Sequence, residues 1–189
     1  MVVYPLSHSF LTGQNQLHMS SAHQNLSASA EQELPSGEGK KFGIVVSQWN
    51  GPITQALLAG CTETLLRNQV KEQDLEIIWV PGSFELPSGA KILLGHQAFD
   101  AIICLGCVIT GETKHNEYIN NAVAQGLTML SVASGTPCIF GVLTPDTEQQ
   151  ALDRAGGILG NKGVEAAAAA LQMAGIKQRL RKGKTRIGF

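Results

Sequence analysis

The sequence has few charged residues and no surplus of either sign. Charged residues make up 15% of the 189 residues, against about 25% in an average soluble protein. Small residues, among them 21 glycines, take their place, which favours a surface partly hidden in contacts between subunits. The formal net charge is −1, so the chain lacks the broad positive charge on which nucleic-acid binding usually depends. We expect no nucleic-acid partner.

Long hydrophobic runs are also absent. No stretch approaches the roughly 20 consecutive apolar residues that a membrane span requires. The first ten residues lack the basic start and the apolar core of a secretory signal. We therefore expect a soluble, cytoplasmic protein that has no membrane partner.

Cysteine is scarce, and its pattern excludes a disulfide framework. Cys61, Cys104, Cys107 and Cys138 all lie in apolar stretches, which is typical of buried thiols in a reducing compartment. Cys104 and Cys107 have the spacing of half a zinc site, but no second pair of cysteines and no suitably spaced His completes it. We expect no metal site.

Several catalytic signatures are missing or incomplete. The glycine-rich stretch 156–163 has no Ser or Thr directly after Lys162, so it is not the phosphate loop of an NTPase. Gly37-Glu38-Gly39 lacks the third glycine of a dinucleotide-binding fingerprint. No Ser or Cys has the sequence context of a hydrolytic nucleophile. These absences favour acid–base chemistry.

The chain divides into an extension, one domain and a tail. Residues 1–39 contain no Lys or Arg and show no regular hydrophobic period, which predicts a flexible N-terminal extension. The alternative is an organellar transit peptide, although such peptides are rich in Arg and poor in acids. We expect residues 40–180 to form a single domain and residues 181–189 to form a basic, solvated tail.

From residue 41 onward, apolar runs alternate with helical stretches. The runs predict four strands buried on both faces: Phe42–Ser47, Leu75–Val80, Ala101–Ile109 and Cys138–Leu143. The intervening and following stretches predict helices: Ile53–Asn68, Leu86–His96, Lys114–Ser134, Thr147–Arg154 and Lys162–Met173. This alternation predicts an α/β fold, a flavodoxin-like three-layer αβα sandwich around a four-stranded parallel sheet.

The residues that follow the third run are the most informative candidates for a site, because such sheets bind ligands at the carboxyl ends of their strands. Gly111, Glu112 and Thr113 open a long helix, whose free N–H groups and dipole favour an anion such as phosphate. The alternative is an ordinary helix cap made by Thr113. His115 lies in the first turn, where the dipole and Lys114 disfavour the imidazolium form. A neutral imidazole there could move protons, although a lone His is more often structural.

The other strand ends carry residues that have two interpretations each. Trp49 could stack on a flat heterocycle, with Asn50 supplying amide hydrogen bonds, or it could pack at the rim of the sheet. Glu85 could accept hydrogen bonds from a ligand's hydroxyl or N–H groups, or it could be the acid at a helix start. Arg154 and Lys162 could bind phosphate, or they could be surface residues.

Five separated motifs closely resemble those of the 6,7-dimethyl-8-ribityllumazine synthase family. They are SQWN, PGSFELP, GCVITGETKHNEYI, PCIFGVLT and DRAGGILGNKGVEAA, and the resemblance covers about residues 41–173. It implies a transferase without a cofactor that condenses 5-amino-6-(D-ribitylamino)uracil with 3,4-dihydroxy-2-butanone 4-phosphate. Phosphate and two waters would be released, in the penultimate step of riboflavin biosynthesis.

The resemblance also implies a role for each matching residue. His115 would be the acid–base residue, and Trp49 would stack on the pyrimidine. Phe140 and Arg154 would reach the site from the neighbouring subunit. The remaining substrate-binding residues would be Ser83, Phe84, Glu85, Cys107, Val108 and Ile109, and those of the phosphate would be Glu112, Thr113, Arg154 and Lys162, beside Gly111.

The chain departs from the usual pattern of this family at a few positions. Trp49 stands where many members have Phe, and Cys107 stands where Ala is usual. Thr110 replaces a frequent Arg, and Lys114 replaces Pro or Thr. The last two changes alter the charge near the expected phosphate.

Members of this family form pentameric rings, and some assemble into icosahedral shells. The short connection at 156–163 favours a shell. Two other functions remain open: a flavodoxin-like module that holds flavin without catalysis, and a storage or scaffold shell whose catalysis has decayed. His115 and Arg154 argue against the flavin-holding module, which would not require them. Intact His115, Glu85 and Arg154 argue against the shell with decayed catalysis.

Overall fold

The chain folds around one parallel β-sheet. A computed structural model describes Ser27 and residues 34–184, with side chains as far as residue 181. The four strands, in the order β2-β1-β3-β4, are all parallel. They are β1 (Phe42–Ser47), β2 (Leu75–Val80), β3 (Ala101–Cys107) and β4 (Cys138–Leu143). The predicted α/β sandwich is confirmed.

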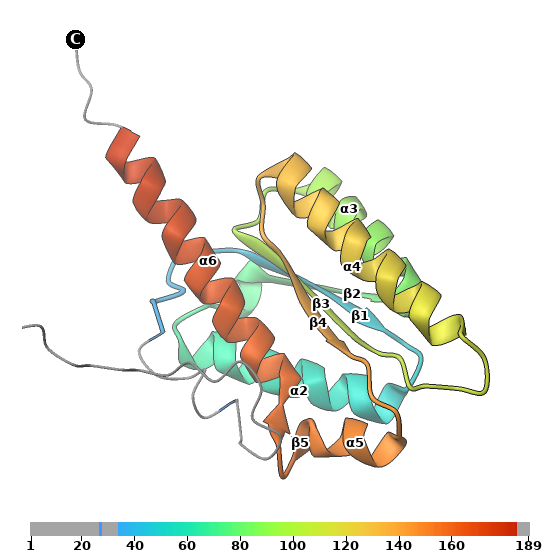
Figure 1. The fold of residues 1–189 in the computed structure, drawn as a ribbon. Coiled ribbons are helices and arrows are strands. Elements are labelled where there is room, and N and C mark those ends of the chain that lie inside the picture. Colours follow the sequence, from blue (N-terminus) through green and yellow to red (C-terminus); the bar gives the residue numbers. More distant parts are fainter. Residues whose placement is uncertain (1–26, 28–33, 185–189) are drawn as a thin grey trace, which may run out of the picture.

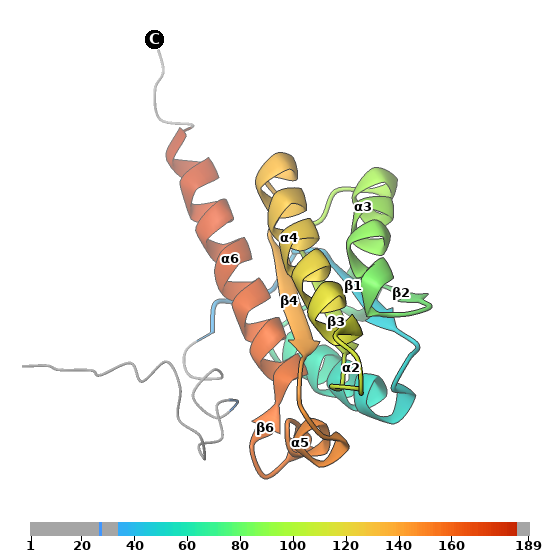
Figure 2. The same cartoon turned by 45° about the vertical axis from the view of Figure 1, so that its right-hand side comes forward.

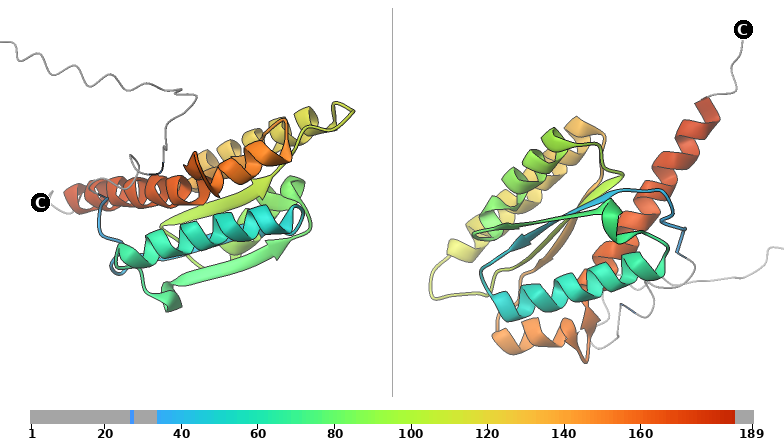
Figure 3. Two further views of the ribbon diagram at one scale, coloured as in Figure 1. Left: turned by 90° about the horizontal axis from the view of Figure 1, so that it is seen from below. Right: turned by 180° about the vertical axis from the view of Figure 1, so that it is seen from behind.

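Two helices cover each face of the sheet. The helices α3 (Leu86–His96) and α4 (His115–Ser134) pack on one face, and α2 (Gly51–Arg67) and α6 (Lys162–Lys184) pack on the other (Figure 1). The view from behind shows the strands running between these two layers (Figure 3, right). A short helix α5 (Glu148–Asp153) and the 3₁₀ turns η1 (Glu72–Asp74) and η2 (Ser83–Glu85) complete the helical elements that the structure describes.

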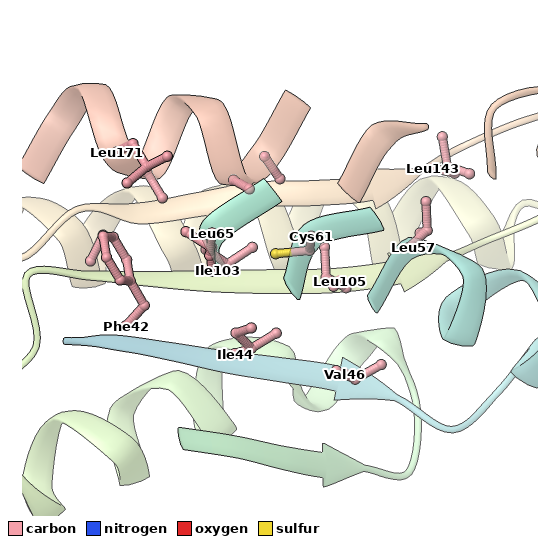
Figure 4. Close-up of a cluster of buried hydrophobic side chains, with 14 of the residues drawn as sticks. Phe42, Ile44, Val46, Leu57, Cys61, Leu65, Ile103, Leu105, Leu143 and Leu171 are labelled. Atoms are coloured by element: carbon pink, nitrogen blue, oxygen red, sulfur yellow. The ribbon is translucent and has the colours of Figure 1, made fainter. Parts of the chain in front are cut away.

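The central strands β1 and β3 are buried along their whole length. Their apolar side chains alternate between two clusters, one on each face of the sheet. In the cluster beneath α2 and α6, Ile44 and Leu105 of the sheet are buried together with Leu57 of α2 and Leu171 of α6 (Figure 4). Small residues let α6 lie close to this cluster, since the alanines at 166–168 and 170 are at most 3% exposed.

The edge strand β2 differs from the prediction. Ile77 and Trp79 are 39% and 41% exposed, so the expectation that every strand is buried on both faces is wrong for β2. Both side chains lie on the face that α2 and α6 cover elsewhere, at the edge of the sheet. β3 also ends at Cys107 instead of Ile109, because its ladder with β4 ends at the pair Cys107–Leu143.

The end of the chain is more ordered than the sequence indicated. A small hairpin of β5 (Ala155–Gly157) and β6 (Gly160–Asn161) forms within the glycine-rich stretch, where no strand was predicted. The helix α6 continues to Lys184 instead of ending at Met173, so it includes the start of the expected tail. Gly175 does not end this helix; it leaves room for Pro35, whose ring atoms lie 3.3 Å from the position of a Cβ there.

Part of the expected extension 1–39 contacts the domain. The N–H of Gly37 donates to the carbonyl of Asn68 at 2.7 Å, and Leu34 packs against the core cluster beneath α2 and α6. Ser27 is 8% exposed. The rest of residues 1–33, and residues 185–189 of the tail, lie outside the described part of the chain.

The start of α6 lies so close to α2 that only glycine fits at residue 163. A Cβ on Gly163 would lie 1.9 Å from the carbonyl oxygen of Leu57, whereas a Cβ on Gly95 in α3 would meet nothing within 4 Å. We expect Gly163→Ala to lower the free energy of unfolding by about 1–3 kcal/mol. Gly95→Ala should raise it by about 0.5–1 kcal/mol.

Denaturant unfolding of the two variants measures this difference. The pair is matched because each adds one methyl group within a helix. A Gly163→Ala variant as stable as Gly95→Ala would contradict the close approach of α6 to α2.

Candidate active site

A cavity of about 500 Å³ opens at the carboxyl ends of β1, β2 and β3. Residues from three different connections of the chain line it, as the strand-end rule predicts. The lining contains eleven of the residues selected from the sequence: Trp49, Asn50, Ser83, Phe84, Glu85, Cys107, Val108, Ile109, Gly111, Thr113 and His115.

The connection after β1 is fixed by hydrogen bonds to both neighbouring strands. The N–H of Trp49 donates to the carbonyl of Pro81 at 3.2 Å. The Asn50 side chain donates from Nδ2 to the carbonyl of Cys107 at 2.9 Å. Asn50 adopts a left-handed backbone conformation, with φ of 60°, which Asn tolerates better than most residues. The turn thereby ties three strand ends together and presents the indole of Trp49, which is 73% exposed. This exposure does not agree with the alternative that Trp49 packs at the rim.

The connection after β2 places one hydroxyl and one carboxylate in the cavity. The Glu85 carboxylate accepts a hydrogen bond from the N–H of Gly82 at 2.9 Å, so Glu85 does serve as the acid at a helix start while it lines the cavity. Ser83 is 6% exposed, and its hydroxyl has no hydrogen-bond partner among the described residues. A buried hydroxyl without a partner is costly, and a ligand in the cavity could supply one.

The connection after β3 brings His115 to the cavity. His115 is the first residue of α4, and its side chain is exposed. No side chain caps this helix: Lys114 occupies the cap position without a side-chain hydrogen bond. The alternative in which Thr113 caps the helix is therefore wrong. The N–H of Glu117 already donates to the carbonyl of Lys114 at 3.1 Å, which leaves the N–H groups before it at the start of α4 to an anion.

The cysteines are free thiols, as predicted. Cys61, Cys104 and Cys107 are buried and Cys138 is half-buried. Burial raises the pKa of the Cys107 thiol to about 11, so this group stays protonated at neutral pH and is a poor nucleophile. Cys107 instead contributes its carbonyl, which holds Asn50. Within the described part of the chain, no three His, Cys, Asp or Glu side chains gather as a metal site.

A second cavity, of about 680 Å³, lies beside β4 and α5. It holds three of the four other ring- and phosphate-binding candidates: Phe140, Arg154 and Lys162. One Nη of Arg154 lies 3.0 Å from Oε1 of Glu165, and Nζ of Lys162 lies 3.0 Å from Oε2 of the same carboxylate. Asp153 also lines this cavity, so together with Glu165 two carboxylates balance the two cations. A phosphate bound there would compete with Glu165 for the two cations.

Comparison with known proteins identifies the family. The sequence profile described as 6,7-dimethyl-8-ribityllumazine synthase matches residues 39–178. A protein of that name from Cytophaga hutchinsonii is 50% identical over 155 residues, which cover 82% of this chain and 97% of the relative. Another from Flavobacterium johnsoniae is 48% identical over 161 residues, which cover 85% of this chain and 84% of the relative. The chain belongs to the 6,7-dimethyl-8-ribityllumazine synthase family.

Membership of this family confirms the resemblance found in the sequence, including the expectation of a transferase. Within the residues described, no helix is both long and apolar enough to cross a membrane.

The cavities of this family member separate the predicted residues into two groups. His115, Trp49 and Glu85 meet in the first cavity, and Arg154 lies in the second. Glu112 is exposed in the turn before α4 and does not line the first cavity.

Sequence reasoning missed several residues of these cavities, and three of them bear on the chemistry. Asn116 and Ile119 line the first; Ile119 lies four residues after His115, a spacing that places both on one face of a helix. Glu165 holds both cations of the second and lies three residues after Lys162 on α6, another spacing that brings side chains together. Helical spacing could have identified Ile119 and Glu165.

Thr110 is the centre of a small hydrogen-bond network. The Thr110 hydroxyl donates to the Asp146 carboxylate at 3.2 Å and accepts from Nδ2 of Asn116 at 3.2 Å. The N–H of Thr110 also donates to the carbonyl of Pro145 at 3.0 Å. The network links the connections after β3 and β4 next to His115, and it contains no positively charged side chain.

Proposed function

We propose that this enzyme condenses 5-amino-6-(D-ribitylamino)uracil with 3,4-dihydroxy-2-butanone 4-phosphate. The product is 6,7-dimethyl-8-ribityllumazine, and phosphate and two waters leave without the help of a cofactor. The observation that carries the proposal is the first cavity, in which an exposed indole, a carboxylate and an imidazole from three strand ends meet. Membership of the lumazine synthase family supports it.

The pyrimidine substrate fits the side of the cavity formed by Trp49 and the end of β3. A flat ring would stack on the exposed indole, and its polar edge would meet backbone groups of residues 107–109. Ser83, Phe84 and Glu85 would hold the ribityl chain, since the free Ser83 hydroxyl and the Glu85 carboxylate can bond to sugar-like hydroxyls. Asn50 acts on this substrate through the carbonyl of Cys107 that it holds.

The phosphate fits the start of α4. Gly111, Glu112 and Thr113 precede a helix whose first N–H groups no side chain caps, and such groups attract anions. Arg154 and Lys162 would complete the phosphate site from a neighbouring subunit, with Phe140 closing the pyrimidine pocket. Two separate cavities on one chain support this arrangement, because each would be half of a site between subunits.

His115 would be the general acid and base. Imine formation between the 5-amino group and the ketone, loss of phosphate, and ring closure all require proton transfer. An imidazole at the start of α4 can give and take these protons. The remaining acceleration comes from holding two substrates together, which makes the reaction effectively unimolecular.

The direct test is to mix the protein with the two substrates. Fluorescence of the lumazine product and release of inorganic phosphate should rise together. A protein that purifies with stoichiometric yellow flavin and shows no turnover would instead support the flavin-holding module.

Loss of the His115 imidazole should slow turnover without abolishing it. We expect His115→Ala to lower kcat by roughly 10- to 1000-fold, the contribution of a general acid–base residue, while orientation of the substrates persists. His96→Ala is the matched control, because His96 is exposed near the end of α3, outside the cavity. An unchanged kcat in His115→Ala would remove this residue from the mechanism.

Loss of the Arg154 guanidinium should weaken binding of the phosphorylated substrate alone. We expect Arg154→Ala to raise the KM for the butanone phosphate. Lys162 would be the remaining cation for the phosphate, and its charge is already paired with Glu165. The control is Arg67→Ala, which removes a guanidinium from α2. Steady-state kinetics with each substrate varied in turn distinguishes the outcomes. A KM effect confined to the pyrimidine would refute the assignment.

We propose that the chain assembles as pentamers, and that pentamers join into an icosahedral shell. The short connection that carries the β5–β6 hairpin supports the shell. The free thiols are consistent with an enzyme of the reducing cytoplasm. Sedimentation or electron microscopy of the purified protein should show shells, and particles no larger than a pentamer would exclude them.

A further inference from the structure

Ser27 makes a contact that the sequence did not indicate. Its hydroxyl accepts a hydrogen bond from the N–H of Asn161 at 2.7 Å and donates one to the carbonyl of Asn161 at 3.1 Å, across 134 positions of the chain. Ser27 is 8% exposed. One side chain therefore satisfies both backbone groups of a residue in β6, at a place largely closed to water.

Asn161 connects the hairpin to two helices. Its side chain donates to the carbonyl of Ala56 in α2 at 2.9 Å and accepts from the N–H of Gly163 at 2.7 Å. Gly60 of α2 leaves room for this side chain, since a Cβ there would lie 2.7 Å from it. The side chain is thus committed to α2 and α6, and the N–H of Asn161 depends on Ser27.

The same hairpin sets the position of both candidate phosphate-binding residues. Asn161 pairs with Ala155 across the hairpin, so Arg154 precedes one member of the pair and Lys162 follows the other. The N–H of Lys162 also donates to the carbonyl of Arg154 at 2.9 Å. A shift of Asn161 would therefore move the base of both side chains. Figure 2 shows β6 beside α5, at the point where α6 begins.

We propose that Ser27 is a positioning residue for the phosphate-binding side chains. By bonding both backbone groups of Asn161, it fixes the β5–β6 hairpin and, through the hairpin, the approach of Arg154 and Lys162 to a phosphorylated substrate. Ser27 thereby acts on phosphate affinity from a position far from the substrate-binding residues in the sequence. This inference rests on the proposed role of Arg154 and Lys162.

The two hydrogen bonds between Ser27 and Asn161 are suited to positioning the hairpin, because their loss affects the backbone of one residue only. Without the hydroxyl, the N–H of Asn161 loses its hydrogen-bond partner, which is unfavourable at a place largely closed to water. The hairpin has only five residues in its two strands, and three of them are glycines, so its own ladder resists displacement weakly. The defect would be relieved by a shift of the hairpin, while the sheet and the first cavity keep their own contacts.

The test compares Ser27→Ala with Ser36→Ala and Ser27→Thr. Ser36 is the control because its exposed hydroxyl lies in the same N-terminal segment and bonds to the Gln69 side chain. Ser27→Thr retains the hydroxyl and should rescue the function. For Ser27→Ala we expect a rise of about fivefold in the KM for the butanone phosphate, the factor that one net hydrogen bond provides. The kcat and the KM for the pyrimidine should stay unchanged.

Two further measurements separate this inference from the proposed function. Hydrogen exchange of the Asn161 amide should become at least tenfold faster in Ser27→Ala alone, which tests the contact without substrates. Calorimetric titration with inorganic phosphate should show a weaker affinity for this variant, which tests the phosphate site without turnover. If the unmodified protein fails to turn over but binds inorganic phosphate more tightly than Ser27→Ala does, the proposed reaction fails and the positioning role stands.

Several results would overturn the inference. A Ser27→Ala variant that matches Ser36→Ala in KM and in exchange shows that the contact has no role. A fall in kcat with similar rises in both KM values, together with a lower Tm, shows a purely structural role. A Ser27→Thr variant that fails to restore phosphate affinity, although its Asn161 amide is protected, separates the contact from the function.

Discussion

Burial of the two central strands is the constraint on which the rest of the molecule depends. β1 and β3 lie between two helical layers and leave no face to solvent, so the helices must pack close to both sides of the sheet. This packing fixes where each strand ends, and the connections that leave those ends carry the functional groups. The first cavity is therefore a consequence of the core: its indole, carboxylate and imidazole come from separate connections that the buried strands align.

Most of the fold could be predicted because its signals are local. The limits of β1, β2 and β4 and of α3 agree with the predicted ranges, since each apolar run is bounded by residues that end it. The exposure of Ile77 could not be predicted, because an apolar run does not show whether its strand lies at the edge or in the centre of the sheet. The hairpin at 155–161 is held by contacts with Ser27 and α2, and no local pattern encodes contacts between residues so distant in sequence.

The residues of the candidate site were predictable as a set, but their partners were not. Strand-end residues such as Trp49 and His115 were identified from their positions, and the structure brings them to one cavity. The structure also shows what each side chain is already bonded to: Glu85 holds Gly82, and Glu165 holds both Arg154 and Lys162. These contacts decide how much hydrogen-bonding capacity and charge each side chain still offers to a ligand. Sequence spacing alone does not show which contacts a side chain already makes.

The sequence contains only two tryptophans, and the fold gives them different surroundings. Trp49 is 73% exposed at the mouth of the first cavity, whereas Trp79 lies on the edge strand β2 and does not line that cavity. An aromatic ligand that stacks on Trp49 would quench one indole and leave the other as an internal reference. Intrinsic emission of the unlabelled protein can thus follow occupancy of the ring-binding half of the cavity, independently of turnover.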